Sequence, residues 1–553
     1  MVDVAESASL LARARRALAA ARDYADAAGL ALAARVSENK EVSNGLLDRE
    51  QRAAHGYAWT ETTVTALAAL LDWAEKAERR GDLHDADILA LEIAFGEQLA
   101  QLIGGLPMGP AEIFRPRDLG IENAAREFAR DGAAAGFLAI GNSAANRVRL
   151  VTILGEGGAI DESFDDATLN AVRGQFRRFA AERILPNAQA WHLANALVPD
   201  AVVAEMATLG AFGVCIPEAY GGQGLGRLAM CVISEELSRG WIGAGSLGTR
   251  SEIAGELILL AGTDAQKAHW LPKIAKGEIL PAAAFTEPDA GSDLGAIKTR
   301  ASRTAAGWSI TGAKTWITHA ARSDLMTLLV RTPAGLSMFL AAKPRGTTDD
   351  PFPAAGMSGT EIEVLGYRGM REYELAFDGF EAPEDSLLGG KEGEGFKQLM
   401  RTFESARIQT AARGVGVARR AFELGLAYAL VRKQFGRPII EFPRVSDKLA
   451  MMAVDTLMAR ELAYFSAREK DKGRRCDIEA GMAKLFAARA AWANADASLQ
   501  IHGGAGYALE SEISRVFCDA RILSIFEGSA EIQAHIIARG RLAERLETPA
   551  SVT

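Results

Sequence analysis

The chain has 553 residues, of which 49% are hydrophobic and 24% are charged. This length predicts three or four domains, with enough apolar material for globular cores. The net charge of −9 and the lack of any Lys/Arg block argue against a nucleic-acid partner. No uncharged apolar run is long enough to span a membrane, so we expect no membrane association.

Cysteine and histidine spacings predict neither a disulfide framework nor a metal site. No H-E-x-x-H occurs among the seven histidines, and no two cysteines form a C-x-x-C pair. We therefore expect no metal and four incidental thiols: Cys215, Cys231, Cys476 and Cys518.

Residues 1–160 predict a helical domain. Acidic Asp3 and Glu6 precede an Ala/Arg-rich stretch, and no apolar h-region follows. This is not a secretory signal, and we expect a cytoplasmic protein. Glycines at 155–158 separate this domain from the next. Apolar residues recur at helical spacing in three segments: Ser7–Val36, Arg49–Arg80 and Asp85–Ile103.

Residues 161–281 predict a second helical domain, whose first helix over Asp166–Glu182 should stop before Pro186. A G-x-G-x-x-G match over Gly243–Gly248 follows a charged helix rather than a strand, so we reject a dinucleotide-binding fold. Two further helices and two glycine-rich loops are expected: Ala229–Ser238 and Glu252–Ala261 as helices, Tyr220–Gly226 and Gly240–Gly248 as loops.

Residues 282–394 predict an antiparallel sheet or barrel, and residues 395–553 predict helices again. Six segments rich in β-formers alternate with Gly, Asp and Pro: Trp308–Thr311, Lys314–Thr318, Leu325–Arg331, Leu336–Ala342, Thr360–Leu365 and Tyr373–Phe377. Four helices follow: Phe396–Arg432, Ser446–Lys470, Ile478–Gln500 and Ser529–Leu546.

Five short segments in a fixed order carry the strongest functional signal: Ala284–Asp293, Lys314–Thr318, Arg432–Gly436, Gln500–Gly506 and Ile525–Ser529. Together they resemble the acyl-CoA dehydrogenase family from Asp166 to about Leu546. The resemblance implies an α+β multidomain fold with a helical domain, an antiparallel β-barrel-like domain and a C-terminal helical bundle. Residues 1–160 would be an extra N-terminal helical domain.

The same resemblance implies that FAD lies against Phe285, Thr286 and Ser292, with Ser292 also near CoA. Hydroxyls and turn amides after a strand can donate hydrogen bonds to phosphate oxygens or ring carbonyls. The alternative is an ordinary β-turn, because the residue types in this segment also favour one. Trp316 and Thr318 should share one face of a strand and contact the flavin. A buried core pair is the alternative.

Further cofactor contacts implied by the family pattern would reach the FAD of a neighbouring subunit. An arginine suits a pyrophosphate, and a glycine permits close backbone approach. This implies a homodimer or a dimer of dimers, although an arginine at this position could instead cap a helix. The residues are Arg432, Gln434, Phe435, Gln500 and Gly504.

Glu404 and Arg407 are three residues apart on a predicted helix and fall where the family holds the CoA moiety. The family often has aspartate in place of Glu404, and a plain surface ion pair is the alternative.

Glu527 is the base that the resemblance implies, with Gly528 beside the substrate. It would remove the α-proton of the thioester while the β-hydrogen leaves as hydride to the flavin. A minority of the family places the base directly before Arg407, but Ala406 stands there. A glutamate stabilised by a helix N-terminus is the alternative.

The long N-terminal extension resembles members that oxidise a short branched diacid acyl-CoA. Such a substrate has a distal carboxylate that needs a cation or several donors, and we predict Arg250, helped by Ser246 and Thr249. A relative that acts on another diacid has its arginine at the position of Ala244 here. Arg250 would therefore either bind the distal carboxylate from a different position or be a surface residue.

Electrons would pass to an electron-transferring flavoprotein. Three alternatives stay open: a dehydrogenase for another short or branched acyl-CoA, an acyl-CoA oxidase that uses O₂, and a non-catalytic acyl-CoA-binding protein.

Overall fold

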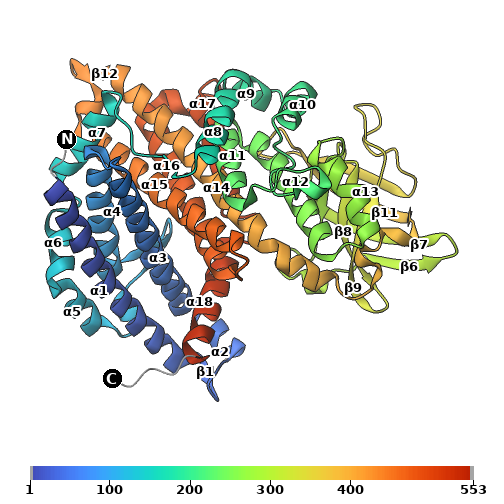
Figure 1. Ribbon diagram of the computed structural model, residues 1–553, viewed down its shortest axis with the longest axis horizontal. Coiled ribbons are helices and arrows are strands. Elements are labelled where there is room, and N and C mark those ends of the chain that lie inside the picture. The colour runs from blue at the N-terminus through green and yellow to red at the C-terminus, as the bar shows by residue number, and fades with distance from the viewer. Residues whose placement is uncertain (1–3, 548–553) are drawn as a thin grey trace. The chain divides into compact units, whose positions relative to one another are not determined.

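The computed structural model describes residues 4–547 and divides into two compact units (Figure 1). The first unit joins three stretches of chain, Met1–Asn170, Val417–Glu469 and Arg475–Thr553. The second contains Ala171–Gly416 and Lys470–Arg474. No helix in the described part of the chain is both long and apolar enough to cross a membrane.

Long helices form the amino-terminal block of the first unit, and Figure 1 shows α1, α3 and α4 as neighbours. The three helices expected here are confirmed; two hairpins with strands of two to four residues were too short for alternation to reveal. The elements are α1 (Val4–Val36), β1 (Ser37–Glu38), β2 (Glu41–Val42), α2 (Asn44–Arg49), α3 (Gln51–Arg80), α4 (Asp85–Gly104), β3 (Leu106–Gly109), β4 (Glu112–Phe114), α5 (Glu122–Arg130), α6 (Gly132–Ile140) and α7 (Ala144–Gly155).

Asp87 fixes the start of α4. Its carboxylate accepts hydrogen bonds from the backbone N–H of His84 (2.8 Å) and of Asp161 (2.7 Å). The first bond caps the helix, and the second ties α4 to the chain that leaves the block. The side chain is fully buried. Burial raises the pKa of Asp87 to about 6, despite these two bonds.

Helices from the end of the chain complete the first unit, and α18 packs on both α3 and α16. Arg489 of α16 donates to the carbonyl oxygen of Pro107 (2.6 Å), and its guanidinium lies 4.1 Å from the ring centroid of Trp59. The amino-terminal block therefore shares its core with the last helices of the chain. Those helices are α15 (Pro443–Asp471), α16 (Asp477–His502), α17 (Glu512–Ile522) and α18 (Ala530–Glu547).

The second unit begins with helices, and two expectations are corrected here. The segment Gly240–Gly248 is not a loop, because α12 runs through it. The helix does not stop before Pro186 either, since a π-helical turn over Ala180–Ile184 leads directly into α9, with the proline in its first turn. The elements are α8 (Ala167–Phe179), α9 (Leu185–Leu193), α10 (Asp200–Thr208), α11 (Gly226–Gly240), α12 (Ile242–Ala261) and α13 (Asp264–Ala275).

A seven-stranded, mainly antiparallel sheet follows, in the order β10-β11-β7-β6-β8-β5, with β9 paired to β8. One face buries a core in which Trp308 meets Phe339 edge to face, with ring centroids 5.3 Å apart. The strands are β5 (Pro281–Ala284), β6 (Arg300–Thr304), β7 (Gly307–Thr318), β8 (Leu325–Thr332), β9 (Gly335–Ala342), β10 (Met357–Ile362) and β11 (Glu372–Ala382). Two predicted strands, Trp308–Thr311 and Lys314–Thr318, are thus one strand, β7.

The helix α14 (Gly395–Val431) contributes its first part to the second unit and the rest to the first. A hairpin of β12 (Lys433–Gln434) and β13 (Arg437–Pro438) follows it.

Candidate functional site

The segments expected at the flavin come together at one end of β7. The buried Lys314 donates from Nζ to the carbonyl oxygen of Phe285 (2.9 Å) and to Oε1 of Glu287 (2.8 Å). The backbone N–H of Thr315 donates to the carbonyl oxygen of Thr286 (3.0 Å). The loop that carries Phe285 and Thr286 is therefore fastened to the strand that carries Trp316.

Charge balance at this junction favours an ionised Glu287. Burial alone would raise the pKa of its carboxyl, but hydrogen bonds from the Lys298 N–H, Lys314 and Thr299 outweigh burial and leave the pKa below its usual value. Burial lowers the pKa of Lys314 to about 8, against the pull of Glu287. At neutral pH the two groups form a buried ion pair.

Trp316 and Thr318, which the sequence predicts to share one face of a strand, differ in backbone conformation and exposure. Two residues, Thr315 and Trp316, lie opposite Glu374 in a β-bulge, and Trp316 has a left-handed backbone (φ 58°). A bulge redirects a side chain, and the indole is 57% exposed. Thr318 is buried, and its hydroxyl donates to both carboxylate oxygens of Glu372 (2.8 and 3.0 Å).

Aromatic contacts connect this junction to α14. The ring of Phe285 lies edge to face with that of Phe403, with centroids 6.4 Å apart. The guanidinium of Arg407 lies 5.7 Å from the Phe403 ring centroid. Two residues predicted to bind different parts of the ligand, Phe285 and Arg407, thus contact the same phenylalanine. Ser292 is exposed on the same loop.

Glu404 forms an ion pair, but with Lys470 (2.9 Å), which lies near the end of α15. The carboxylate is mostly buried, so the alternative of a plain surface pair does not describe it.

Two buried arginines meet at Tyr367, and one of them was not foreseen. Arg250 (8% exposed) lies on α12 and Arg413 (0% exposed) on α14. Each approaches the Tyr367 hydroxyl at 3.4 Å, and Arg413 also donates to Ser246 Oγ (3.0 Å). Thr249 donates to the carbonyl oxygen of Gly245 on its own helix. Arg250 is therefore not a surface residue.

In the first unit, the hairpin after α14 and the end of α16 lie together. Tyr428 of α14 stacks on His502 of α16, with ring centroids 4.3 Å apart. This contact places Arg432, Gln434 and Phe435 at the same end as Gln500 and Gly504, all of them exposed. Phe435 is 93% exposed and has a left-handed backbone (φ 50°).

Glu527 lies in the turn before α18, also in the first unit. Both Glu527 (φ 53°) and Gly528 (φ 89°) have left-handed backbones. Lys484 of α16, which sequence reasoning missed, donates from Nζ to the carbonyl oxygen of Gly528 (2.5 Å). The placement of this base opposite the flavin stays a prediction, since the flavin segments belong to the second unit.

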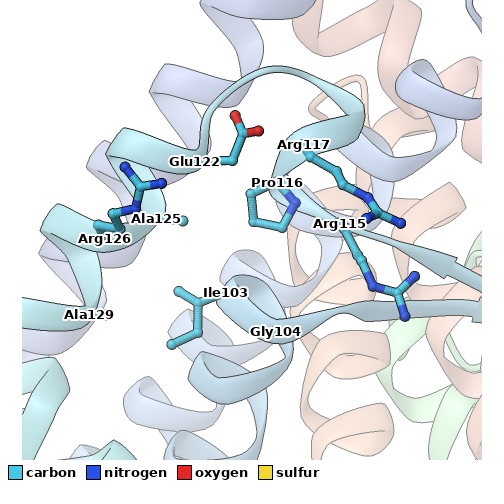
Figure 2. Close-up of a pocket in the computed structure, with 9 residues that line it drawn as sticks. All are labelled: Ile103, Gly104, Arg115, Pro116, Arg117, Glu122, Ala125, Arg126 and Ala129. Atoms are coloured by element: carbon cyan, nitrogen blue, oxygen red, sulfur yellow. The ribbon is translucent and has the colours of Figure 1, made fainter.

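A shallow groove of about 480 Å³ lies in the amino-terminal block (Figure 2). Arg115 and Arg117 flank Pro116 on one side of it, and Glu122 and Arg126 lie on the other. Its lining comes from residues 103–129, so it contains none of the predicted site residues. Among residues 4–547, no group of three or more His, Cys, Asp or Glu side chains could hold a metal ion.

Three family models match consecutive parts of the chain: the N-terminal domain of acyl-CoA dehydrogenases over residues 166–278, the middle domain over 282–380 and the C-terminal domain over 393–542. The chain belongs to the acyl-CoA dehydrogenase family. The (2S)-methylsuccinyl-CoA dehydrogenase of Cereibacter sphaeroides is 55% identical over 540 residues, covering 96% of this chain and 98% of that protein.

Solved structures of other acyl-CoA dehydrogenases confirm the predicted fold. A glutaryl-CoA dehydrogenase in complex with glutaryl-CoA is 32% identical with a TM-score of 0.65, and the match covers 69% of this chain and 97% of that one. A glutaryl-CoA dehydrogenase from Mycobacterium smegmatis in complex with FADH2 is 26% identical with a TM-score of 0.63, and the match covers 70% of this chain and 96% of that one. Residues 1–165 of this acyl-CoA dehydrogenase precede the first family match.

Proposed function

We propose that this acyl-CoA dehydrogenase oxidises a short branched diacid thioester, (2S)-methylsuccinyl-CoA, to mesaconyl-CoA. The observation that carries the choice of substrate is the pair of buried arginines at Tyr367. The name of the relative that is 55% identical over almost the whole chain supports the same substrate.

Two guanidinium groups in the core suit a distal carboxylate. Arginine remains charged in proteins, and its planar fork matches the geometry of a carboxylate. Arg250, Arg413 and the Tyr367 hydroxyl offer several donors from three different segments. A carboxylate there would accept charge-assisted hydrogen bonds from them. A monoacid such as butyryl-CoA would leave the same donors facing an apolar chain end.

The residues present fit FAD. An exposed indole at Trp316 offers a flat surface for an aromatic ring, and the neighbouring loop provides the hydroxyls of Thr286 and Ser292. Arg432, Gln434, Phe435, Gln500 and Gly504 would serve the FAD of a second copy, which implies a homodimer or a dimer of dimers. When bound, FAD accepts the hydride from the β-carbon of the thioester. An electron-transferring flavoprotein would take the electrons onward.

Glu527 would remove the α-proton. Substrate binding excludes water from the site and raises the proton affinity of a carboxylate, which is what a general base needs. Glu404, Arg407 and Ser292 would hold the CoA moiety, and Gly528 would lie against the thioester. Side chains that bind both ends of the substrate would restrict the motion of its α-carbon, which favours proton transfer.

The test is a substrate screen with a dye acceptor, using methylsuccinyl-, glutaryl-, isobutyryl- and butyryl-CoA. We expect the highest kcat/KM with methylsuccinyl-CoA, and we expect Glu527→Gln to abolish turnover while FAD stays bound. A preference for butyryl- or isobutyryl-CoA would refute the diacid assignment. Fast reoxidation of the reduced enzyme by air would indicate an oxidase.

A further inference from the structure

Lys484 is a fully buried lysine (0% exposed) on α16, among the apolar residues Ala483 and Leu485. Burial of an ammonium group is unfavourable unless it has hydrogen-bond acceptors. Its Nζ atom donates to the carbonyl oxygen of Gly528 at 2.5 Å. This bond joins α16 to the turn before α18, and those helices pack against each other (orange and red in Figure 1).

The turn that receives this bond has an unfavourable backbone. A left-handed conformation is unfavourable for a non-glycine residue, and Glu527 (φ 53°) adopts it directly before Gly528 (φ 89°). Such a backbone persists only where its surroundings hold it.

We propose that Lys484 is a positioning residue for Glu527, holding the Glu527–Gly528 turn in its left-handed form so that the carboxylate stays aimed at the α-carbon. The proposal rests on the proposed role of Glu527 as the base. As a positioning residue, Lys484 would touch neither substrate nor cofactor and would act through the carbonyl group of Gly528.

Glu531, in the first turn of α18, offers a different explanation for the buried ammonium. The pKa of its carboxyl is lowered by its own backbone N–H first, and also by Ser529, His55 and Lys484. Lys484 could therefore matter only as a counter-charge for this exposed glutamate. Glu531→Gln removes that charge and leaves the bond to Gly528 intact, which makes it the matched control.

The experiment compares FAD-loaded wild type, Lys484→Met, Lys484→Arg and Glu531→Gln. Methionine keeps the apolar stem without the donor, whereas arginine keeps a charged donor. Amide hydrogen exchange of the peptide 524–533 reports the order of the turn independently of catalysis. We expect Lys484→Met to speed exchange there by about tenfold or more. Its kcat should fall by about 10–100-fold while KM changes less than about threefold.

Lys484→Arg should recover part of both effects, and Glu531→Gln should behave like wild type. Unchanged exchange in Lys484→Met, or faster exchange with an unchanged kcat, would overturn the proposal. Equal effects from Glu531→Gln would overturn it as well. If Lys484→Met does not fold, Lys484→Gln is judged by the same two readouts.

Glu527→Gln, measured in parallel, separates this proposal from the proposed function. If that variant retains activity, the base assignment fails, while the exchange of the peptide 524–533 in Lys484→Met still reports whether Lys484 orders the turn.

Discussion

Three residues predicted to form the site have left-handed backbones although none of them is glycine: Trp316, Phe435 and Glu527, with φ of 58°, 50° and 53°. Such conformations are rare for residues with a Cβ atom and gather at functional sites. Trp316 lies in a β-bulge, and Glu527 lies in a turn whose Gly528 carbonyl oxygen accepts a hydrogen bond from Lys484. The backbone thus points each side chain in a direction that a regular strand or helix would not.

Arg413 should determine acceptance of a diacid. Charge-assisted hydrogen bonds contribute about 1.5–3 kcal/mol each. We therefore expect Arg413→Met to lower kcat/KM for methylsuccinyl-CoA by about 10–100-fold and to change butyryl-CoA by less than about threefold. Arg250→Ala should have the same selectivity. Steady-state kinetics with both thioesters measures the effect.

Arg413→Lys is the matched control for charge alone, because it keeps a cation but loses the planar fork. It should recover only part of the diacid activity. An equal loss with both thioesters in Arg413→Met would contradict a role at the carboxylate, and flavin absorbance would show whether the variant still holds FAD.

The sequence predicted Arg250, Ser246 and Glu527 as site residues but not the residues that contact them or their neighbours. Arg413 lies 167 positions from Ser246, and Lys484 lies 44 positions from Gly528. Contacts between residues so far apart depend on how the helices pack, and a local sequence pattern does not predict that packing. The signal that remained was a single charged residue within a short run of apolar and small residues: Arg413 within Ala411–Ala418 and Lys484 within Ala480–Ala488.

At the scale of elements, the clearest error is α12, whose glycines suggested a loop. The helix forms because tertiary packing outweighs the low helix propensity of glycine. A Cβ atom on Gly245 would lie 1.9 Å from Ser238 Oγ, and one on Gly243 would lie 2.8 Å from the carbonyl oxygen of Arg368. The glycines let neighbouring segments approach α12 closely, and this places Arg250 in the core.

The start of α4 gives a pH-dependent prediction. Burial raises the pKa of Asp87 to about 6, whereas a carboxyl in the unfolded chain titrates near about 4. Between these values the folded protein binds a proton that the unfolded chain lacks, so this group makes the free energy of unfolding fall as pH rises through that window. Above about pH 6 the full penalty of about 3 kcal/mol applies.

Asp87→Asn removes this titration. Thermal unfolding of both proteins at several pH values should show the Tm of the variant rising relative to wild type between about pH 4 and 6 and then remaining parallel. The lost carboxylate oxygen adds only a constant offset. A Tm difference that is the same at about pH 4.5 and pH 7 would contradict a raised pKa for Asp87.

At the scale of the whole molecule, the amino-terminal block lies outside the family matches but is part of the first unit's core. Its helix α3 packs on α18 and α16, and Trp59 lies under the buried Arg489. The sequence predicted a helical extension here, but not its partners, because its interfaces are formed with residues several hundred positions away.

Deletion of residues 1–155 should therefore impair stability and assembly rather than chemistry. The deletion exposes apolar surface on α16 and α18 that the block now covers. We expect aggregation or an altered oligomeric state by size-exclusion chromatography. Any folded fraction that binds FAD should keep its preference among thioesters. A stable deletion variant with the wild-type oligomeric state would contradict this expectation.

The discontinuous first unit also has a consequence for biosynthesis. About 450 residues separate the end of α3 from the start of α18. At ribosomal rates of about 5–20 residues per second, roughly 20–90 s pass between the synthesis of α3 and the synthesis of α18, on which it packs. During that interval an apolar helical face is uncovered. A chaperone that shields nascent chains is therefore expected to bind this enzyme early in translation and to release it only when the last helix has left the ribosome.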